Sequence, residues 1–500
     1  MTGKRNAILA NLVVFLTSVS SLSLHAQVLD SSFGTNGIVV MPFDQSSGGG
    51  ITSVVQQADG KIIAAGGAKS SFAMIRYHLN GTVDSSFASN GRLIKQFNGH
   101  FGGANNVLIQ PDNKIIVSGT ALGSNENFAI ARFDQDGTPD LDFNGTGDAV
   151  IDISSSDYCY GMALQPDGKI ILCGERSLMP NNAIVVIRLN PDGTVDSAFN
   201  NGQGIFYGQY GIWSSRLNEV IVKPDGKIIA CGNANNNNTD FLLIQLLPNG
   251  QLDSSFGTNG VVVTPNTGFG HDFALQPDGK IVIVGRDVAT GGHMVRYMAD
   301  GSIDNSFGTN GHVLITHPLG RPGPEQVEID KDGKIYAAGY IDTGNEEIYL
   351  VRFNADGSID NTYAHYGIIT SLSPQQERTH AMLIQQDGKI LMAGSVSVNF
   401  SGNFGMLRFW PFPLSVNETN NKQDFKIFPN PATDVLYLDD ARFVEDRYIY
   451  TIFSSTGEVL QAGVLLSPQI NITNIPKGVY IIQIIDRKSG STTYARFCKL

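Results

Sequence analysis

One ten-residue pattern recurs along most of the chain and constrains its architecture more than any other feature. In each copy an Asp in a turn is followed by Lys two residues later and by Gly seven residues later, as at Asp167, Lys169 and Gly174. A period of 53 to 58 residues separates successive copies, and such periods are typical of propellers and solenoids. The seven turn aspartates are Asp59, Asp112, Asp167, Asp225, Asp278, Asp332 and Asp387.

Each repeat contains four short runs of β-forming residues separated by turns. In the first copy, the runs 51–57 and 61–65 are joined by an Asp-Gly pair, and a third run follows at 72–77. Asp-Gly between such runs predicts a hairpin, and we expect a type I′ turn with positive φ at both central residues. Four strands per unit, with no helical period in residues 27–413, predict an all-β fold, a seven-bladed β-propeller. A β-solenoid is the alternative, although its coils are usually shorter.

The two ends of the array predict how the ring closes. Run 37–41 matches the fourth run of other copies, such as 260–263, whereas the last copy stops after its third run at 407–409. We therefore expect the N-terminal run to supply the outer strand of the last blade, because an incomplete blade would leave an open edge. The third run ends in Arg in six copies and in Gln245 in the fourth. This Arg is expected to pair with an acid nearby, such as the Asp in the equivalents of Val-Asp-Ser-Ser-Phe.

Both termini differ from the array. Residues 1–26 have a basic start, an apolar stretch and Ala at position 26, which predicts a signal peptide. A membrane anchor is the alternative, but hydroxyl side chains shorten the apolar run. After the repeats, residues 414–424 form a polar linker, and 425–500 contain short strands with turns. This last segment is predicted to be a small C-terminal β-sandwich.

The charge and cysteine content limit the kind of partner and compartment. The chain has 34 Lys and Arg against 46 Asp and Glu, for a net charge of −12, and no basic run. This balance argues against nucleic acid and anionic membranes as partners. We also expect no membrane span after signal removal. Cys173 and Cys231 share one repeat position, which predicts a slot for a small buried side chain. Four cysteines in a chain of this length are too few for a disulfide framework.

The repeats resemble a known family of exported bacterial proteins, the delta-60 repeat family. The likeness covers about 380 residues and all seven copies. It implies a propeller-like repeat domain and no particular reaction. The residues that carry it in the first copy are Leu29-Asp30-Ser31-Ser32-Phe33-Gly34-Thr35-Asn36-Gly37, Asp59-Gly60-Lys61 and Ile75-Arg76-Tyr77.

Residues 425–500 resemble the type A C-terminal sorting domain of the type IX secretion system. The resemblance implies that the type IX machinery carries the folded protein across the outer membrane and that the domain is then removed. Release, or attachment to surface lipopolysaccharide, would follow, so we expect a secreted or cell-surface protein. An accessory β-sandwich that binds a ligand itself is the alternative. The likeness is carried by Pro429-Asn430-Pro431, Gly457, Gly478-Val479-Tyr480 and the ending from Arg496 to Lys499.

No motif in the sequence marks an active site. The Ser-His-Asp, His-Glu-x-x-His and Cys-x-x-Cys patterns and a phosphate-binding loop are all missing from the sequence. Asp134, Asp136 and Asp140 lie around a glycine turn and offer the hard oxygen ligands that Ca²⁺ uses, but the later Glu of an EF-type loop is missing. We therefore expect neither a cofactor nor a metal, with calcium as the alternative.

One face of the propeller is predicted to carry the function. In an antiparallel meander the Asp-Gly turns lie on one face, and the second-to-third and fourth-to-first connections lie on the other. The latter vary between copies, and scaffolds carry binding residues on variable loops. Trp213 is the residue that we would test first. The alternative is that Trp213 packs between blades and binds no ligand. The candidate binding residues on this variable face are His100, Phe101, Tyr207, Tyr210, Trp213, Phe269, His271, Arg321, Arg378 and His380.

These observations favour a binding or structural module for an extracellular glycan or protein. The alternative is a hydrolase or lyase that acts on a polysaccharide, with its site assembled from propeller loops. Paired Asp or Glu in blade-specific loops would favour that enzyme, but those loops are rich in Asn, Ser, Gly and aromatic residues. The sequence therefore favours binding over catalysis.

Overall fold

The described part of the computed structural model consists of 35 strands and their connections, without a helix. The chain divides into two compact units, Met1–Phe412 and Pro413–Leu500, which are described separately below. The predicted signal peptide (1–26) and the predicted linker (414–424) lie outside the described residues. The structure describes residues 29–43, 49–97, 101–153, 155–177, 181–236, 238–287, 289–344, 346–360, 363, 368–370, 377–398, 401–410, 427–430, 432–438, 448–454, 459–486 and 492–499.

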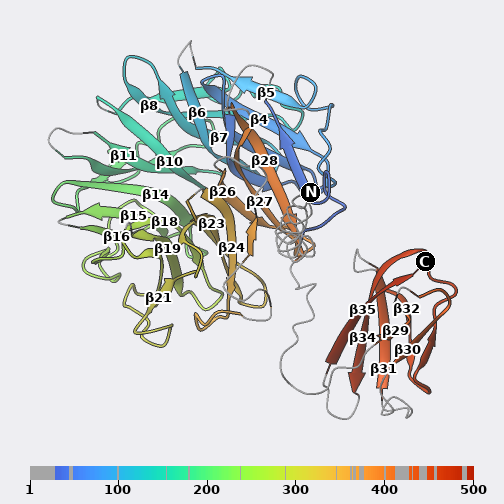
Figure 1. Ribbon diagram of the computed structural model, residues 1–500. Coiled ribbons are helices and arrows are strands. Elements are labelled where there is room, and N and C mark those ends of the chain that lie inside the picture. The colour runs from blue at the N-terminus through green and yellow to red at the C-terminus, as the bar shows by residue number, and fades with distance from the viewer. Residues whose placement is uncertain are drawn as a thin grey trace, which may run out of the picture. The chain divides into compact units, whose positions relative to one another are not determined.

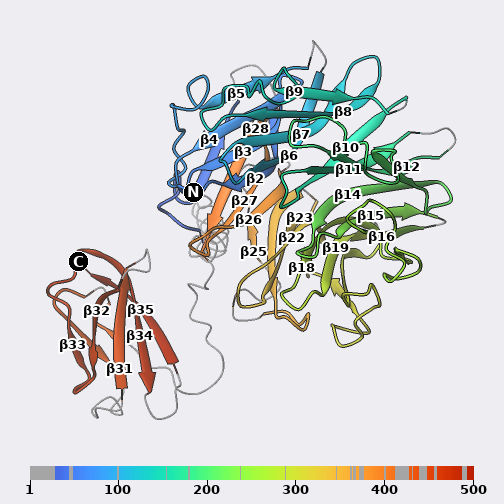
Figure 2. The ribbon, with the colours of Figure 1, turned by 180° about the vertical axis from the view of Figure 1, so that it is seen from behind.

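Strands β1 to β28 form seven four-stranded antiparallel sheets, which fan around a common centre (Figures 1 and 2). The first strands of the sheets are β2 (Gly49–Gln56), β6 (Phe101–Ile109), β10 (Asp157–Leu164), β14 (Ser214–Val222), β18 (Phe269–Leu275), β22 (Arg321–Ile329) and β26 (Glu377–Ile384). The second strands are β3 (Ile62–Ala68), β7 (Ile115–Leu122), β11 (Ile170–Arg176), β15 (Ile228–Asn235), β19 (Ile281–Asp287), β23 (Ile335–Asp342) and β27 (Ile390–Val398).

The outer half of each sheet is formed by a third strand and a short fourth strand. The third strands are β4 (Ser71–Tyr77), β8 (Glu126–Phe133), β12 (Ala183–Leu189), β16 (Thr239–Leu246), β20 (Gly291–Tyr297), β24 (Glu346–Phe353) and β28 (Ser401–Phe409). The fourth strands are β5 (Arg92–Lys95), β9 (Asp148–Ile151), β13 (Ile205–Gly208), β17 (Val261–Thr264), β21 (His312–Ile315), β25 (Ile368–Thr370) and, in the last sheet, β1 (Ile38–Met41).

The first strands form a closed inner ring. Each contacts the first strands of both neighbouring sheets, and β26 contacts β2. A sheet in such a ring is covered on both faces, so its middle strands lose the usual alternation of apolar and polar residues. Every residue of β4 and of β12 is buried. Cys159, Cys173 and Cys231 are buried free thiols in this packing, which confirms the predicted small-residue slot for Cys173 and Cys231.

The ring closes with the N-terminal strand, which confirms the predicted strand exchange. Strand β1 pairs with β28, with Ile38 opposite Leu407 and Met41 opposite Phe404. The two ends of the array are also joined by an ion pair, because Arg408 lies 2.7 Å from Asp30 and both side chains are almost fully buried. The last sheet therefore has four strands, like the other six.

The third-strand Arg and the turn Lys of each repeat converge on one buried Asp, as expected for the Arg. In the first sheet, Arg76 lies 2.8 Å and Lys61 lies 3.8 Å from the Asp84 carboxylate. Gln245 takes the place of Arg in the fourth copy and donates to Asp253 at 2.8 Å. The other clusters are Arg132–Asp140–Lys114, Arg188–Asp196–Lys169, Arg296–Asp304–Lys280, Arg352–Asp360–Lys334 and Arg408–Asp30–Lys389.

The same arginines link neighbouring sheets. Nη1 of Arg296 donates to the carbonyl oxygen of Ala355, which lies in a turn of the next sheet. Its guanidinium also lies 4.4 Å from the centre of the Phe307 ring. A charge buried between sheets is stable only when it is paired and hydrogen-bonded, and the cluster provides both. We call these seven groups the Arg–Asp–Lys clusters.

The hairpins form where the Asp-Gly pairs predict them, but the predicted turn type is wrong. In the first copy, Gly60 N donates to Gln57 O and Gln57 N donates to Lys61 O. Only the third loop residue has positive φ, with Gly60 at 86° and its counterpart Asn113 at 67°. This is a type I turn followed by a left-handed residue, as in three-residue hairpin loops. The Asp59 carboxylate accepts from Lys61 N at 3.1 Å, so the Asp closes the turn without needing positive φ.

The C-terminal unit contains two further sheets that share one core. One sheet consists of β29 (Ile427–Phe428), β30 (Val435–Leu438) and β33 (Gln469–Asn471), and the other of β32 (Val459–Val464), β31 (Tyr448–Ser454), β34 (Gly478–Asp486) and β35 (Thr492–Lys499). Leu436 and Ile470 from the first sheet pack in one cluster with Ile452 and Ile482 from the second. This arrangement is the predicted small β-sandwich.

Candidate functional site

The ten predicted binding residues fall into different parts of the propeller. His100 lies outside the described residues, and only the backbone of Phe101 is described. Tyr207 is in β13, and Tyr210 and Trp213 lie in the connection from β13 to β14. The remaining five were expected in loops but lie in first strands, at the inner ring. They are Phe269 and His271 in β18, Arg321 in β22, and Arg378 and His380 in β26.

Every first strand carries a β-bulge at the same repeat position. In β18, Gly270 pairs with Gly285 and Asp272 pairs with Val284, so that His271 is left without a partner in the ladder. Side chains of a regular first strand face the neighbouring sheets, whereas a bulge can re-aim one side chain. The residues skipped at the seven bulges are Thr52, Asn105, Tyr160, Asn218, His271, Glu325 and His380.

These seven residues, which we call the bulge ring, line one cavity of about 230 Å³ at the centre of the propeller. Three of them form hydrogen bonds to the neighbouring sheet. Thr52 donates to Ala104 O at 2.7 Å, and Asn105 and Asn218 donate to Cys159 O and Gly270 O at 2.5 Å. In each case the acceptor belongs to the next sheet and directly precedes its own bulge residue. Thr52, Asn105 and Asn218 therefore hold adjacent sheets together.

The other members of the bulge ring carry acid–base groups. Nδ1 of His380 lies 2.7 Å from Oε2 of Glu325, so that one carboxylate orients the imidazole. Burial raises the pKa of Glu325, but the His380 hydrogen bond and nearby positive charges outweigh this effect and leave that pKa below its usual value. Burial lowers the pKa of His271, and the charges of Arg216 and Arg286 add to that effect against the opposing influence of Glu325. His271 is therefore expected to be neutral at pH 7.

Two further carboxyl groups lie directly after bulge residues. Burial, with the Asp272 charge adding to it, raises the pKa of Glu219 to about 8. Burial also raises the pKa of Asp272 to about 7, although Val327 N and Phe273 N donate to its carboxylate. A group with such a pKa can exchange a proton near neutral pH. Of these two groups Glu219 lines the cavity, where it adds a proton donor to the Glu325 carboxylate and the imidazoles of the bulge ring.

Arginine and tyrosine side chains lie along one part of the channel mouth, near the variable-face ends of first and second strands. The guanidinium of Arg216 lies 4.9 Å from the centre of the Tyr160 ring. Arg286 and Arg378 lie 5.2 and 4.8 Å from the centre of the Tyr340 ring. Such contacts are worth about 0.5–2 kcal/mol each and orient both groups. We call these five residues the mouth arc.

The mouth is asymmetric around the ring. Tyr340 covers Gly323 so closely that a Cβ on that glycine would lie 2.8 Å from the Tyr340 ring. On the opposite side, at β6, a Cβ on Gly103 would meet nothing within 4 Å. Among the described residues, bulky aromatic and cationic groups therefore lie on one side of the ring, and a glycine with no described neighbour within 4 Å of its Cβ position lies on the other.

The variable face also exposes large apolar side chains on an ordered loop. Ile212 and Trp213 are 61% and 63% exposed, so Trp213 does not pack between blades. Their backbone is held in place, since Ile212 N donates to Asn236 Oδ1 and Trp213 N donates to Asn235 O. A rigid loop that presents such side chains to solvent is typical of an interaction surface.

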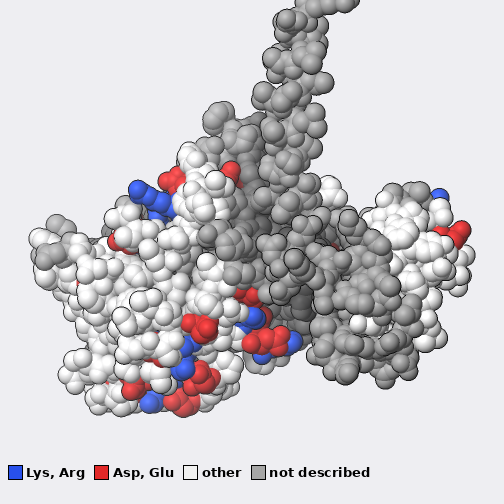
Figure 3. All heavy atoms as spheres, turned by 60° about the horizontal axis from the view of Figure 1, so that its bottom comes forward, with Lys and Arg blue, Asp and Glu red and all other residues white. Residues whose placement is uncertain are grey.

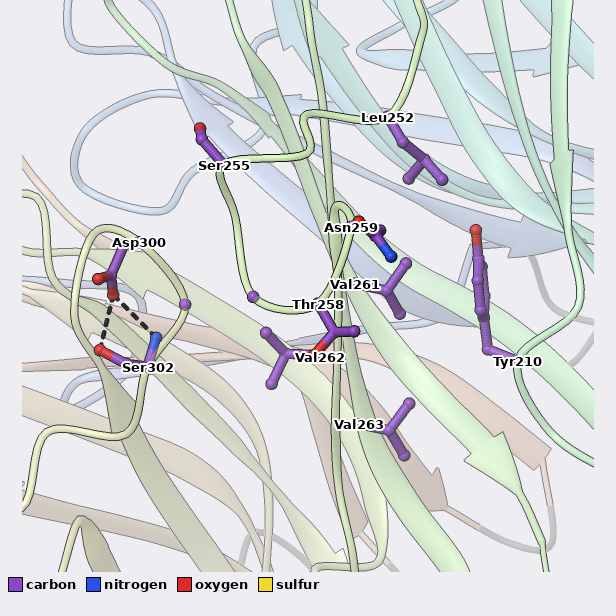
Figure 4. A pocket seen from close by; sticks show the side chains of 12 residues that line it. Tyr210, Leu252, Ser255, Thr258, Asn259, Val261, Val262, Val263, Asp300 and Ser302 are labelled. Atoms are coloured by element: carbon purple, nitrogen blue, oxygen red, sulfur yellow. Dashed lines mark hydrogen bonds between the residues drawn. The ribbon is translucent and has the colours of Figure 1, made fainter.

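A larger cavity of about 780 Å³ lies at the outer strand β17 (Figure 4). Tyr210 faces Val261 and Val263 across it. Two polar groups in its wall bind each other, because Asp300 Oδ1 accepts from Ser302 N at 2.9 Å and from Ser302 Oγ at 2.7 Å. Tyr210 is the only predicted binding residue among those that line this cavity.

The possible calcium loop has its carboxylates engaged elsewhere. Asp140 binds Lys114 and Arg132, and Asp136 accepts from Thr138 N at 2.9 Å. Among the described residues, no group of three or more His, Cys, Asp and Glu side chains converges as a metal site would require. On the face shown in Figure 3, basic and acidic side chains lie beside one another rather than in a patch of one sign.

Two family models match the chain. Residues 57–87, 110–143, 165–199, 223–256, 276–307 and 331–363 match the family described as "Domain of unknown function (DUF5122) beta-propeller". The chain carries DUF5122 propeller repeats. Residues 426–497 match the "Secretion system C-terminal sorting domain", which confirms the second resemblance. The sorting domain indicates export across the outer membrane by the type IX secretion system. In addition, a helix that could cross the membrane is not found within the described ranges.

Several solved structures resemble the DUF5122 propeller chain. PorZ, a surface component of the type IX secretion system of Porphyromonas gingivalis, matches with 12% identity and a TM-score of 0.41 over 89% of this chain and 59% of that chain. The chain thus spans less than two thirds of PorZ. Virginiamycin B lyase from Staphylococcus aureus matches with 13% identity and a TM-score of 0.44, over 74% of this chain and 98% of that chain. No curated protein matches the sequence.

Sequence reasoning found two members of the bulge ring, His271 and His380. It missed the other five although a signal was present, and these five are Thr52, Asn105, Tyr160, Asn218 and Glu325. Each bulge residue lies seven positions before the turn Asp of its repeat, as His271 does before Asp278. This position is variable within an otherwise regular unit. A variable polar position at a fixed offset marks the side chain that the repeat presents to the channel.

Proposed function

We propose that the DUF5122 propeller is an extracellular binding module for a glycan, which it holds at the channel mouth on the variable face. The observation that carries this proposal is the mouth arc opposite the open side at Gly103. A pyranose ring has an apolar face of C–H groups and a rim of hydroxyls. Aromatic rings and a few fixed polar groups in a concave site are suited to such a ligand.

Trp213 supplies a second contact on the same face. The β13–β14 connection leads into the start of β14, where Arg216 lies. A chain of several sugars could therefore contact the exposed Trp213 ring as well as the mouth arc. Surface binding of this kind agrees with export by the type IX system. We propose that the working molecule is surface-displayed or released after removal of the sorting domain.

A glycan array probed with the protein lacking the predicted signal peptide tests this function. We expect a defined set of glycans to bind and the double variant Trp213→Ala, Tyr210→Ala to lose most of that binding while it stays folded, although the loss of Tyr210 from a core cluster lowers its melting temperature. Leu141→Ala is the matched control, because Leu141 is also an exposed apolar residue, at 65%, but lies in a third-to-fourth connection on the opposite face. Equal binding by the double variant and the wild type would show that the variable face is not used.

Processing is tested separately, by the intact mass of the extracellular protein. We expect the mass to correspond to a chain that ends near the linker, before residue 425. Full-length chain that extends to Leu500 outside the cell would contradict removal of the sorting domain.

A polysaccharide hydrolase or lyase is the second candidate, and the acid–base groups in the channel favour it. Glu325 orients His380 as a carboxylate orients a general base, and Glu219 has a pKa of about 8. Incubation of each bound glycan with the protein distinguishes the two candidates. New reducing ends or unsaturated sugars that disappear in His380→Gln would establish catalysis, whereas unchanged glycans would leave binding as the function.

A further inference from the structure

The central cavity is enclosed at its sides by a continuous ring of strands. Each of the seven first strands contacts the first strands of both neighbouring sheets, and the residues that line the cavity come from all seven. A ligand therefore enters along the channel axis, and a chain molecule enters by one of its ends. In this respect the cavity differs from an open groove, which binds the middle of a chain.

The volume of the cavity matches one sugar unit. A volume of about 230 Å³ corresponds to about seven water molecules at ~30 Å³ each. One pyranose ring with its hydroxyl groups fits into this space, whereas two linked rings do not. The size of the cavity therefore favours a terminal residue over an internal stretch of the same glycan.

Four side chains with unengaged polar atoms lie on one arc of the cavity wall, which we call the polar arc. They are Glu219, His271, Glu325 and His380, from β14, β18, β22 and β26 in four successive sheets. Within the described residues, neither nitrogen of the His271 ring has a hydrogen-bond partner, and Glu325 engages only Oε2, with His380. Glu219 accepts from Val220 N at 2.9 Å through Oε1 and keeps Oε2. The polar arc thus has atoms left to bind a ligand.

The groups of the polar arc match the chemistry of sugar hydroxyls. A neutral imidazole offers one N–H donor and one acceptor, and His271 is in this form at pH 7 because burial lowers its pKa. A protonated carboxyl both donates and accepts, and burial raises the pKa of Glu219 to about 8. The free oxygen of Glu325 accepts. A hydroxyl group also donates and accepts, so neighbouring hydroxyls of one ring can bind neighbouring groups of the polar arc.

The charges around the cavity favour a neutral ligand. Among the described residues that line the cavity, none is Lys or Arg. Acids and bases in and around it are similar in number and lie beside one another, so that a ligand of either charge meets repulsion as well as attraction. These groups are the acids Glu175, Glu219, Asp272, Glu325 and Glu346 and the bases Arg216, Arg286, Arg378 and His380.

We propose that the central cavity is the subsite for the terminal residue of a neutral glycan, whose hydroxyls are held by the polar arc. This inference rests on the proposed glycan-binding function and specifies which part of the glycan is recognised. The chain end occupies the cavity, and the residues that follow it lie at the channel mouth. The propeller therefore distinguishes chain ends from chain interiors.

Saturation-transfer NMR tests the proposal with linear oligosaccharides of neutral sugars, built from glucose, galactose, mannose or xylose, and with the corresponding free sugars. For the sugars that bind, we expect the strongest saturation on one terminal residue. Methylation of the hydroxyls of that residue should weaken binding at least tenfold, since several hydrogen bonds are lost. The amino and uronate derivatives of the same sugar should bind more weakly than the neutral form.

Variants of the polar arc locate the site. His271→Gln and Glu325→Gln should each weaken binding about tenfold. Thr52→Val is the matched control, because Thr52 lines the same cavity but donates its hydroxyl to Ala104 O at 2.7 Å. This variant should keep the affinity of the wild type. If the variants of the polar arc unfold, the saturation pattern of the wild type decides alone.

The outcomes separate the two proposals. Saturation that is uniform along the chain, or strongest on internal residues, would overturn the terminal subsite and leave glycan binding standing. A charged derivative that binds more tightly than the neutral sugar would overturn the assignment to a neutral ligand. Absence of binding by every sugar, on the array as well as in solution, would overturn both proposals.

Discussion

The Arg–Asp–Lys clusters and the bulge ring follow the same repeat, yet they behave in opposite ways. Each occurs seven times, once per sheet. Six clusters have the same three residues, and the seventh changes only Arg to Gln245. The bulge ring has five different residue types at its seven positions, among them Tyr160, Glu325 and two histidines.

The difference reflects what each position contacts. A cluster satisfies a charge buried between sheets, and every sheet presents the same geometry, so one solution serves all seven. A bulge residue faces the channel, where seven side chains from different directions meet. Identical residues there would give a symmetric and featureless channel, whereas different residues build one asymmetric site. Repetition therefore indicates scaffold, and variation at a fixed repeat position indicates function.

The largest effect is expected when the ring is opened. Deletion of residues 27–43 removes β1 and Asp30, which leaves β28 without its outer partner and Arg408 buried without its acid. Loss of one partner of a buried ion pair alone costs about 3–5 kcal/mol, so the melting temperature should fall markedly. Val40→Ala, a change at an exposed position of the same strand, is the control. An unchanged melting temperature after the deletion would show that the closure does not stabilise the ring.

Disruption of a single cluster should cost less. Arg296→Ala removes the partner of Asp304 and the link to Ala355 O, and we expect a loss of about 3 kcal/mol in the free energy of unfolding. Arg296→Gln should cost clearly less, because Gln245 holds Asp253 in this way in the fourth sheet. Urea unfolding measures both. Equal losses for the two variants would contradict the view that the clusters work through hydrogen bonding to the Asp.

Acid should weaken the clusters gradually. Burial raises the pKa of Asp84, but bonds from Ser86 and Arg76 outweigh it and hold that pKa at about 2, below the ordinary value of 3.8. The folded state therefore binds fewer protons than the unfolded state, and stability is lost as the pH falls from about 4 to about 2. Asp84→Asn should be less stable at pH 6 and should show a smaller further loss in acid. Parallel pH curves for Asp84→Asn and wild type would exclude this contribution.

The smallest effects on stability are expected in the bulge ring. Asn218→Ala loses one hydrogen bond to Gly270 O and should cost about 1 kcal/mol without changing glycan affinity. His271→Ala should be similar in stability but should weaken binding. Thermal unfolding and calorimetry on the same samples compare the two. If Asn218→Ala weakened binding as much as His271→Ala, the division of the ring into wall and site residues would be wrong.

The sequence by itself determined the repeated architecture of this protein and the way the ring closes. The Asp-x-Lys period predicts the sheets and hairpins, and the missing fourth run after residue 409 predicts closure by the run at 37–41. The Arg–Asp pairs were also expected. These features follow from local patterns and from one comparison between copies, since each sheet repeats the same contacts.

Only the tertiary structure decided what the channel contains. The turn type depends on the backbone at Gly60, which an Asp-Gly pair alone does not specify. The site depends on bulges that turn one side chain per sheet inward, and on ring closure that brings Thr52 and His380 to one cavity although they lie far apart in the sequence. Likewise, Arg216 and Arg286 lie in a first and a second strand, and among the described residues no carboxylate comes within 4.0 Å of either guanidinium. A local pattern carries no information about such absences, because they are set by the packing of all seven sheets around one centre.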